Sequence, residues 1–134
     1  MEDLLNKESV QRVIKVLRDF DSNLKVQSLS SSARTALDAA NSLNCEVGAI
    51  VKSLLFRTED TFLLSLVSGD KRCSLNKLKK ITQIKDISMA SPEDVKTQTG
   101  YTIGGVSPIG HLKKINIFVD SSLERFDDFT DTCV

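Results

Sequence analysis

Lys52 is the residue whose type and surroundings point most directly to chemistry. It lies within the short apolar run 49–56, which is typical of a central β-strand. Strand alternation places its side chain on the same face as Ile50, Leu54 and Phe56, where an ammonium group is costly unless an anion meets it. The lysine therefore either extends to the edge of the sheet or faces a cleft that receives a phosphate, a carboxylate or a developing oxyanion.

A second candidate is the stretch 100–111, which holds four of the six glycines, the only tyrosine and the only histidine. Glycine weakens helices and strands and proline removes a backbone donor, so we expect an ordered loop here. Glycines also let backbone N–H and C=O groups approach a ligand closely. A tight structural turn between two elements is the alternative interpretation.

Three further polar residues have weaker support. Ser107 precedes a proline and lies outside any G-x-S-x-G motif, so nucleophilic catalysis by this serine is poorly supported. His111 is the only imidazole available as a base, but a lone histidine beside Lys113 is more often a hydrogen-bonding residue of a surface or loop. Asp120 follows a predicted strand, where it could position a hydroxyl or a water, or could cap the following turn.

Cofactor chemistry finds little support in the residue types present. No Walker motif and no G-x-G-x-x-G motif opens a helix. A zinc site would require His111 to converge with Cys45, Cys73 and Cys133, which are far apart and lack CxxC spacing. We therefore expect no metal, no cofactor and no disulfide framework.

Composition indicates one ordinary domain over residues 1–134. Eighteen basic and eighteen acidic side chains give a net charge of zero, which argues against non-specific coating of nucleic acid, and we expect no DNA partner. No apolar run approaches a membrane span, and the charged start does not resemble a secretory signal, so we expect a soluble, cytoplasmic protein. The basic groups at 71–72, 77–80 and 113–114 form either a phosphate-binding rim or separate solvated faces.

The elements that must position these residues follow from hydrophobic periodicity and from turn residues. We expect helices over 10–20 after a Ser9 cap, from about 32 to 43, over 74–81, and from Pro92 onward. We expect strands over 24–29, 49–56, 62–67, 84–89 and 115–119. The strands 49–56 and 62–67 should form an antiparallel hairpin that supplies most of the sheet interior, giving an α/β domain with a mixed or mostly antiparallel sheet.

Taken together, these segments resemble the YbaK-type aminoacyl-tRNA deacylases, which include free-standing relatives of the editing domain of bacterial prolyl-tRNA synthetases. The resemblance covers about residues 9–125. It is carried by Ser-Ala-Arg-Thr-Ala at 32–36, Gly-Ala-Ile-Val-Lys-Ser-Leu at 48–54, Tyr-Thr-Ile-Gly-Gly-Val-Ser-Pro-Ile-Gly-His at 101–111, and Phe-Val-Asp at 118–120. It implies an α/β (α+β) fold with a mixed, mostly antiparallel, barrel-like sheet flanked by helices.

The activity implied by this resemblance is hydrolysis of the ester between a wrong amino acid and the 3′-terminal adenosine of a tRNA. The tRNA is most often that for proline, and the amino acid is a small one such as alanine or cysteine. An aminoacyl ester is already activated, so orienting water and supplying backbone donors can replace a strong nucleophile. The implied partners are the acceptor end of the tRNA and, as a second partner, prolyl-tRNA synthetase.

The resemblance also assigns roles by position. Lys52 matches the family's active-site lysine, and 104–108 matches its Gly-x-x-x-Pro loop. The backbone groups of this loop are implied to grip the aminoacyl group and to help place the attacking water. The resulting candidates are Lys52, Gly104 and Gly105 for catalysis, and Val106, Ser107, Pro108 and Asp120 for substrate binding. Nothing is carried over to His111.

The tail 126–134 departs from the family pattern, which continues through further strand and helix after Asp120. We therefore expect a truncated or diverged end that leaves one sheet edge open. The alternative function, from another class, is a non-catalytic module that binds aminoacyl-tRNA or a synthetase and retains the pocket. Retention of Lys52 and of the loop 104–108 favours the enzyme.

Overall fold

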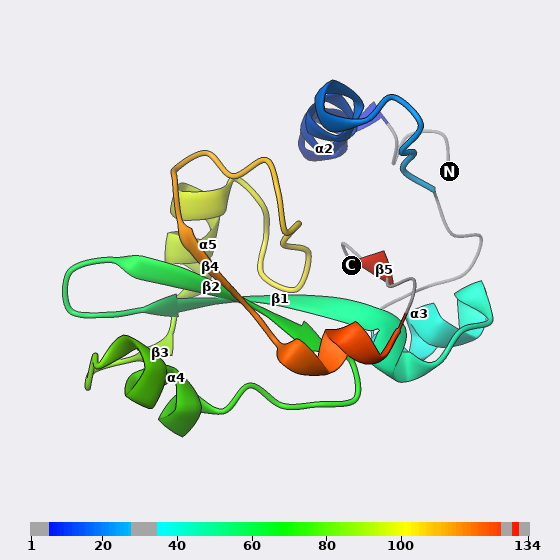
Figure 1. The fold of residues 1–134 in the computed structure, drawn as a ribbon. Helices are drawn as coiled ribbons and strands as arrows, with labels where there is room; N and C mark the ends of the chain where they lie inside the picture. The colour runs from blue at the N-terminus through cyan, green and yellow to red at the C-terminus, as the bar shows by residue number, and fades with distance from the viewer. Residues whose placement is uncertain (1–5, 28–34, 127–129, 132–134) are drawn as a thin grey trace.

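The computed structural model describes residues 6–27, 35–126 and 130–131, which form a mixed sheet with helices on both of its faces (Figure 1). The helices are α2 (Glu8–Phe20), α3 (Ala36–Leu43), α4 (Leu75–Thr82) and α5 (Pro92–Thr99), with short 3-10 turns η1 (Val47–Ala49) and η2 (Ser121–Arg125). The strands are β1 (Ile50–Arg57), β2 (Phe62–Ser68), β3 (Ser88–Met89), β4 (Asn116–Val119) and β5 (Thr130–Asp131). No helix in these ranges is long and apolar enough to cross a membrane.

The sheet has the strand order β3-β1-β2-β4, and β5 pairs with β1 outside this path. β1 and β2 form a long antiparallel pair from Val51 opposite Ser68 to Arg57 opposite Phe62. β3 is antiparallel to β1, whereas β4 is parallel to β2 and β5 is parallel to β1. The predicted hairpin and the mixed α/β architecture are therefore confirmed.

Successive residues of the central pair pack on opposite faces of the sheet. Leu55 and Leu64 belong to a buried cluster with Val95 of α5 and Tyr101 and Val106 of the glycine-rich loop. On the other face, a second buried cluster consists of Phe56, Leu63, Leu78 and Ile87, with Leu54 packed against it. The loop and α4 therefore lie on opposite faces, as the two-residue period of a strand requires.

The four predicted helices are present at the expected positions, but some of them begin or end at other residues than predicted. α2 begins one residue before Ser9, after Lys7, and no side chain caps it. Phe20, the last residue of α2, is 85% exposed. α3 begins at Ala36, where Thr35 accepts a hydrogen bond from Asp38 N. The caps of α4 and α5 are serines, and Pro92 opens α5 as predicted.

Two strand predictions need correction. Residues 24–27 of the predicted strand 24–29 are not in a strand, and the remainder lies outside the described residues. The predicted strand 84–89 is reduced to β3, because Ile84 and Ile87 are drawn into the cluster around α4 instead of extending the ladder beside β1. Tertiary packing here overrides a short apolar pattern.

Candidate active site

A pocket of about 250 Å³ lies along β1, on the edge away from β2. Its lining includes the run 50–55 of β1, Met89 of β3, and Ile103, Gly104 and Val106 of the glycine-rich loop. β3 pairs with β1 only at Phe56–Arg57, and β5 only at Ile50–Val51. The middle of β1 therefore forms the floor of the pocket, and the loop forms one wall.

The wall is shaped by a turn that only glycine adopts readily. α5 ends at Gly100 in the left-handed conformation, and the Gly105 N–H then donates to the Thr102 carbonyl at 2.9 Å. Gly104 has φ of 83°, which is the value a type II turn requires at its third residue. The turn leaves Ile103 51% exposed at the mouth of the pocket.

The N-terminal helix anchors this loop, which the sequence analysis did not foresee. Arg12 of α2 donates from Nε to the Gly110 carbonyl at 2.8 Å, and its guanidinium lies 4.6 Å from the centroid of the Tyr101 ring. Tyr101 is buried and donates its hydroxyl to the Ile109 carbonyl at 2.9 Å. The only sequence feature that could have indicated this role is the position of Arg12 next to Val13, which belongs to the apolar stripe of α2.

Ser107 and His111 also serve the internal structure of the loop. His111 Nε2 lies 2.7 Å from the Ser107 carbonyl, and because a carbonyl only accepts, this nitrogen carries a proton. Ser107 is 1% exposed, and its hydroxyl accepts from the Ile109 N–H at 3.2 Å. Burial lowers the pKa of His111, an effect that its bond to the Ser107 carbonyl opposes and the nearby Arg12 charge reinforces.

The lowered pKa of His111 predicts that the protein loses stability in mild acid. The unfolded chain takes up this proton near pH 6.5, whereas the folded protein resists it. The contribution of His111 to the free energy of unfolding should therefore be greatest above pH 6.5, and the free energy should fall as the pH drops below that value. Urea denaturation at pH 7.5 and 5.5 measures this loss, and a His111→Gln variant should show a smaller one. An equal loss in both proteins would assign the effect to another group.

Lys52 lines the same pocket as Gly104, so the structure brings these two predicted catalytic residues together. Its side chain is half-buried on the face of Leu54, and Nζ donates to the Lys71 carbonyl at 2.6 Å. That face is opposite the one packed by Val106, so the Lys52 side chain leaves β1 on the other side of the sheet from the loop. A substrate anion that binds the ammonium would compete with the Lys71 carbonyl.

Of the remaining predicted site residues, Val106 also lines this pocket, whereas Gly105, Ser107, Pro108 and Asp120 are not among its lining residues. Asp120 caps η2 by accepting from the Ser122 N–H at 2.9 Å and the Ser122 hydroxyl at 2.7 Å, and it also accepts from the Ser68 N–H at 3.3 Å. Burial acts to raise the pKa of Asp120, but these hydrogen bonds outweigh it and the pKa is lowered.

Sequence reasoning missed two apolar residues of the pocket. Met89 and Ile103 are 52% and 51% exposed, and both line the pocket near its opening. A methionine two residues before a helix cap and an isoleucine inside a glycine turn carry no distinctive signal. Among the described residues, no group of histidine, cysteine and acidic side chains could hold a metal ion. Cys133 lies outside the described residues.

Comparisons with known proteins bear on the family and the fold of this chain. The sequence model of the family described as "Aminoacyl-tRNA editing domain" matches residues 30–131. A proline–tRNA ligase of Caldicellulosiruptor saccharolyticus is 31% identical over 98 residues, covering 73% of this chain but only 17% of the ligase. The YwhH protein of Bacillus subtilis, itself described as uncharacterized, is 34% identical over 109 residues, covering 81% of this chain and 69% of that protein.

A solved structure extends this likeness to three dimensions. The crystal structure of a protein proposed as a trans-editing enzyme for prolyl tRNA synthetase matches with a TM-score of 0.84 at 39% identity, covering 90% of this chain and 76% of that one. The resemblance drawn from the residues is thereby confirmed. Since the family match includes Lys52 and the loop 104–108 and spans well over half of the sequence, the chain belongs to the aminoacyl-tRNA editing domain family.

Proposed function

We propose that this chain, acting as one editing domain over residues 1–134, hydrolyses in trans the ester of a mischarged aminoacyl-tRNA. The substrate is proline tRNA that carries a small wrong amino acid such as alanine or cysteine. The observation that carries the proposal is the pocket that Lys52 of β1 lines together with Gly104 and Val106 of the loop. The match to a proposed trans-editing enzyme supports it.

The roles of the pocket residues follow from the hydrogen bonds they already make. The Gly105 N–H is committed to the Thr102 carbonyl, so Gly104 is the better-placed backbone donor for the ester carbonyl and its developing negative charge. Lys52 supplies the positive charge at the opposite side of the pocket. Water held between them attacks the ester, and no protein nucleophile is required because the ester is already activated.

The dimensions of the pocket favour a small amino acid. Its volume of about 250 Å³ lies just below the usual range of roughly 300–1,000 Å³ for small-molecule sites. The apolar side chains of Met89, Val95, Ile103 and Val106 form its walls. Size exclusion fits the needs of editing, because one methylene changes binding by only roughly 1–3 kcal/mol at a synthetase site.

Hydrolysis of charged tRNAs tests the proposal directly. The protein is incubated with proline tRNA charged separately with alanine, cysteine, serine and proline, and loss of each ester is compared with loss in buffer. Faster loss of a small wrong amino acid than of proline is expected. Loss no faster than in buffer for all four would overturn the enzymatic function.

One observation favours a second candidate, the non-catalytic binding module. The Lys52 ammonium is already engaged by the Lys71 carbonyl at 2.6 Å. If the lysine stays in that position, the pocket could bind the aminoacyl end of the tRNA without hydrolysing the ester. Binding of alanine-charged tRNA in preference to uncharged tRNA, without ester loss, would identify this module.

A further inference from the structure

A segment of unusual charge lies between β2 and β3. Residues 71–85, here called the basic segment, contain six of the eighteen basic side chains and no aspartate or glutamate. The chain as a whole has a net charge of zero. Positive charge is therefore concentrated in one segment, which the overall composition conceals.

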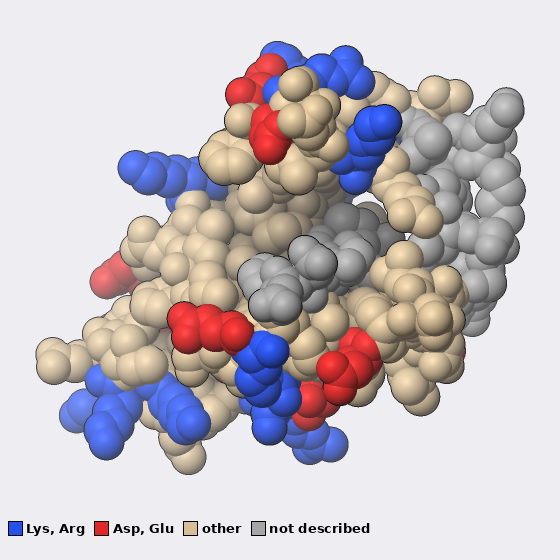
Figure 2. Space-filling view, turned by 45° about the vertical axis from the view of Figure 1, so that its right-hand side comes forward, with Lys and Arg blue, Asp and Glu red and all other residues tan. Residues whose placement is uncertain are grey.

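The acids that flank the basic segment do not neutralise it. Asp70 is paired with Arg125 at 2.9 Å, and Asp86 is 3.9 Å from Arg57. Hydrogen bonds from Arg125 and Ser68 lower the pKa of Asp70 to about 2. Among the described residues, no ion pair involves a lysine of this segment. Figure 2 shows Lys and Arg side chains prevailing along the lower side of the molecule, where Figure 1 places α4.

Helix α4 presents part of this charge on its outer face. Its inner face packs Leu75 and Leu78 against the sheet, whereas Lys77 and Lys80 are exposed and, three residues apart, lie side by side. The helix dipole favours lysines in the last turn, which accounts for Lys79 and Lys80. It does not account for Lys77 in the first turn, where a positive charge is unfavourable. That unfavourable charge is explained if the outer face binds an anion.

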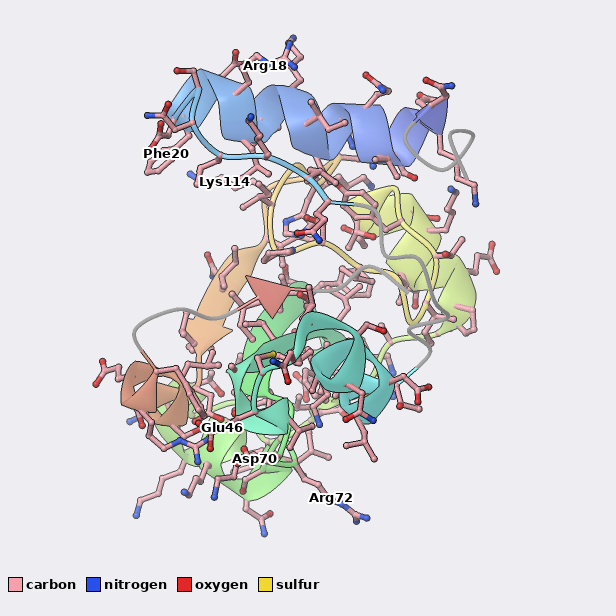
Figure 3. All side chains as sticks on the ribbon, turned by 90° about the vertical axis from the view of Figure 1, so that its right-hand side faces the viewer. Arg18, Phe20, Glu46, Asp70, Arg72 and Lys114 are labelled. Carbon is pink, nitrogen blue, oxygen red and sulfur yellow. The ribbon has the colours of Figure 1, made fainter. Side chains whose placement is uncertain are left out.

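Each end of the basic segment is linked to a residue that lines the pocket. Lys71, its first residue, accepts through its carbonyl from Lys52, which lines the pocket. Three residues after Lys85, its last residue, the chain enters β3, where Met89 lines the same pocket. The exposed pair Lys113–Lys114 is elsewhere, because Figure 3 shows Lys114 beside α2 and Arg72 at the opposite end of the molecule. These two lysines therefore do not complete a common rim.

We propose that the basic segment binds the phosphate backbone of the tRNA acceptor strand, with the outer face of α4 as its main contact. The proposal rests on the proposed function, since a 3′ end held in the pocket places the preceding phosphates beyond its rim. Phosphate contacts position a nucleic acid without reading its sequence. The basic segment thus supplies affinity, and the pocket supplies selectivity for the amino acid.

Neutralising the outer face of α4 tests the proposal. The variant Lys77→Gln/Lys79→Gln/Lys80→Gln is compared with Lys113→Gln/Lys114→Gln on two substrates, alanine-charged proline tRNA and 3′-O-alanyl adenosine, which carries no phosphate. We expect the α4 variant to raise KM for the tRNA about 10-fold with kcat unchanged, and to reduce the slope of log affinity against log salt by about two to three. Hydrolysis of alanyl adenosine should be unchanged, and the control should behave as the wild type.

The outcomes separate this proposal from the proposed function. Wild-type KM and salt slope in the α4 variant, or an equal loss in the control, would overturn the role of the basic segment. If the wild type hydrolyses neither substrate, the proposed function fails. Binding of uncharged tRNA, measured by fluorescence anisotropy, then tests whether the basic segment binds tRNA. A weaker, less salt-dependent affinity of the α4 variant supports it, whereas an unchanged affinity overturns it. Thermal unfolding of each variant verifies that it is folded.

Discussion

A Lys52→Ala variant is expected to hydrolyse alanine-charged proline tRNA about 100-fold more slowly in kcat/KM than the wild type. Among the described residues that line the pocket, Lys52 is the only one with a positively charged side chain. Removing one group that stabilises developing charge in such a site typically costs 100- to 1,000-fold in rate. Single-turnover deacylation with enzyme in excess measures the effect without interference from product release.

Two controls make the Lys52 result specific. Lys113→Ala removes an exposed ammonium of a residue that does not line the pocket, and it should retain wild-type kinetics. Lys52→Met keeps the aliphatic stem beside Leu54 and should be as slow as the alanine variant, which separates lost charge from lost packing. Equal rates for Lys52→Ala and the wild type would remove the lysine from the mechanism and leave the backbone of the loop to act alone.

Gly104→Val is expected to lower the same rate by about 100-fold because it must change the path of the loop. At φ of 83° a β-branched residue is a severe outlier, so the Thr102–Gly105 turn should open. The donor at position 104 then moves, and a displacement of about 1 Å can cost about 100-fold in rate. Deacylation kinetics together with thermal unfolding measure the catalytic and structural parts of the effect.

Gly104→Asn is the matched variant for this experiment. Asparagine is similar in size to valine but adopts the left-handed conformation far more readily. It should therefore keep the turn and lose no more than about 10-fold in rate. If the two variants are equally slow, the pocket is blocked by any side chain at position 104, and backbone conformation is not the cause.

The central hairpin and the loop were the parts of the fold that local pattern predicted well. The continuous apolar run before Arg57 and the turn at 58–61 specify β1 and β2, because few alternatives bury so many apolar side chains. The prediction of a strand over 84–89 from local pattern was wrong for most of that stretch, because only Ser88–Met89 forms a strand. Its short apolar pattern fits either a strand or a packed connection, and the contact of Ile87 with Leu78 of α4 decides between them.

The residues of the candidate site also differ in how far the local sequence could identify them. Lys52 and Gly104 were recognisable as residues with an unusual local setting, and they share one pocket. Asp120 was also recognisable, but the sequence supported equally a residue that positions a hydroxyl or water and a cap of the following turn. The structure shows the cap, at the start of η2. Its role in substrate binding stays a prediction. Arg12 gave almost no local signal, because its partners lie about 90 residues away in the chain.

The sequence by itself determined the hairpin, the caps of the later helices, and the glycine turn whose positive φ other residues resist. These features depend on neighbours within a few residues, where side-chain type and backbone preference act directly. Tertiary structure alone decided that the Lys52 ammonium meets the Lys71 carbonyl, that Arg12 anchors the loop, and that the basic segment adjoins the pocket. Such contacts join residues far apart in the chain, so they exist only once the packing of β1 against its neighbours has been chosen.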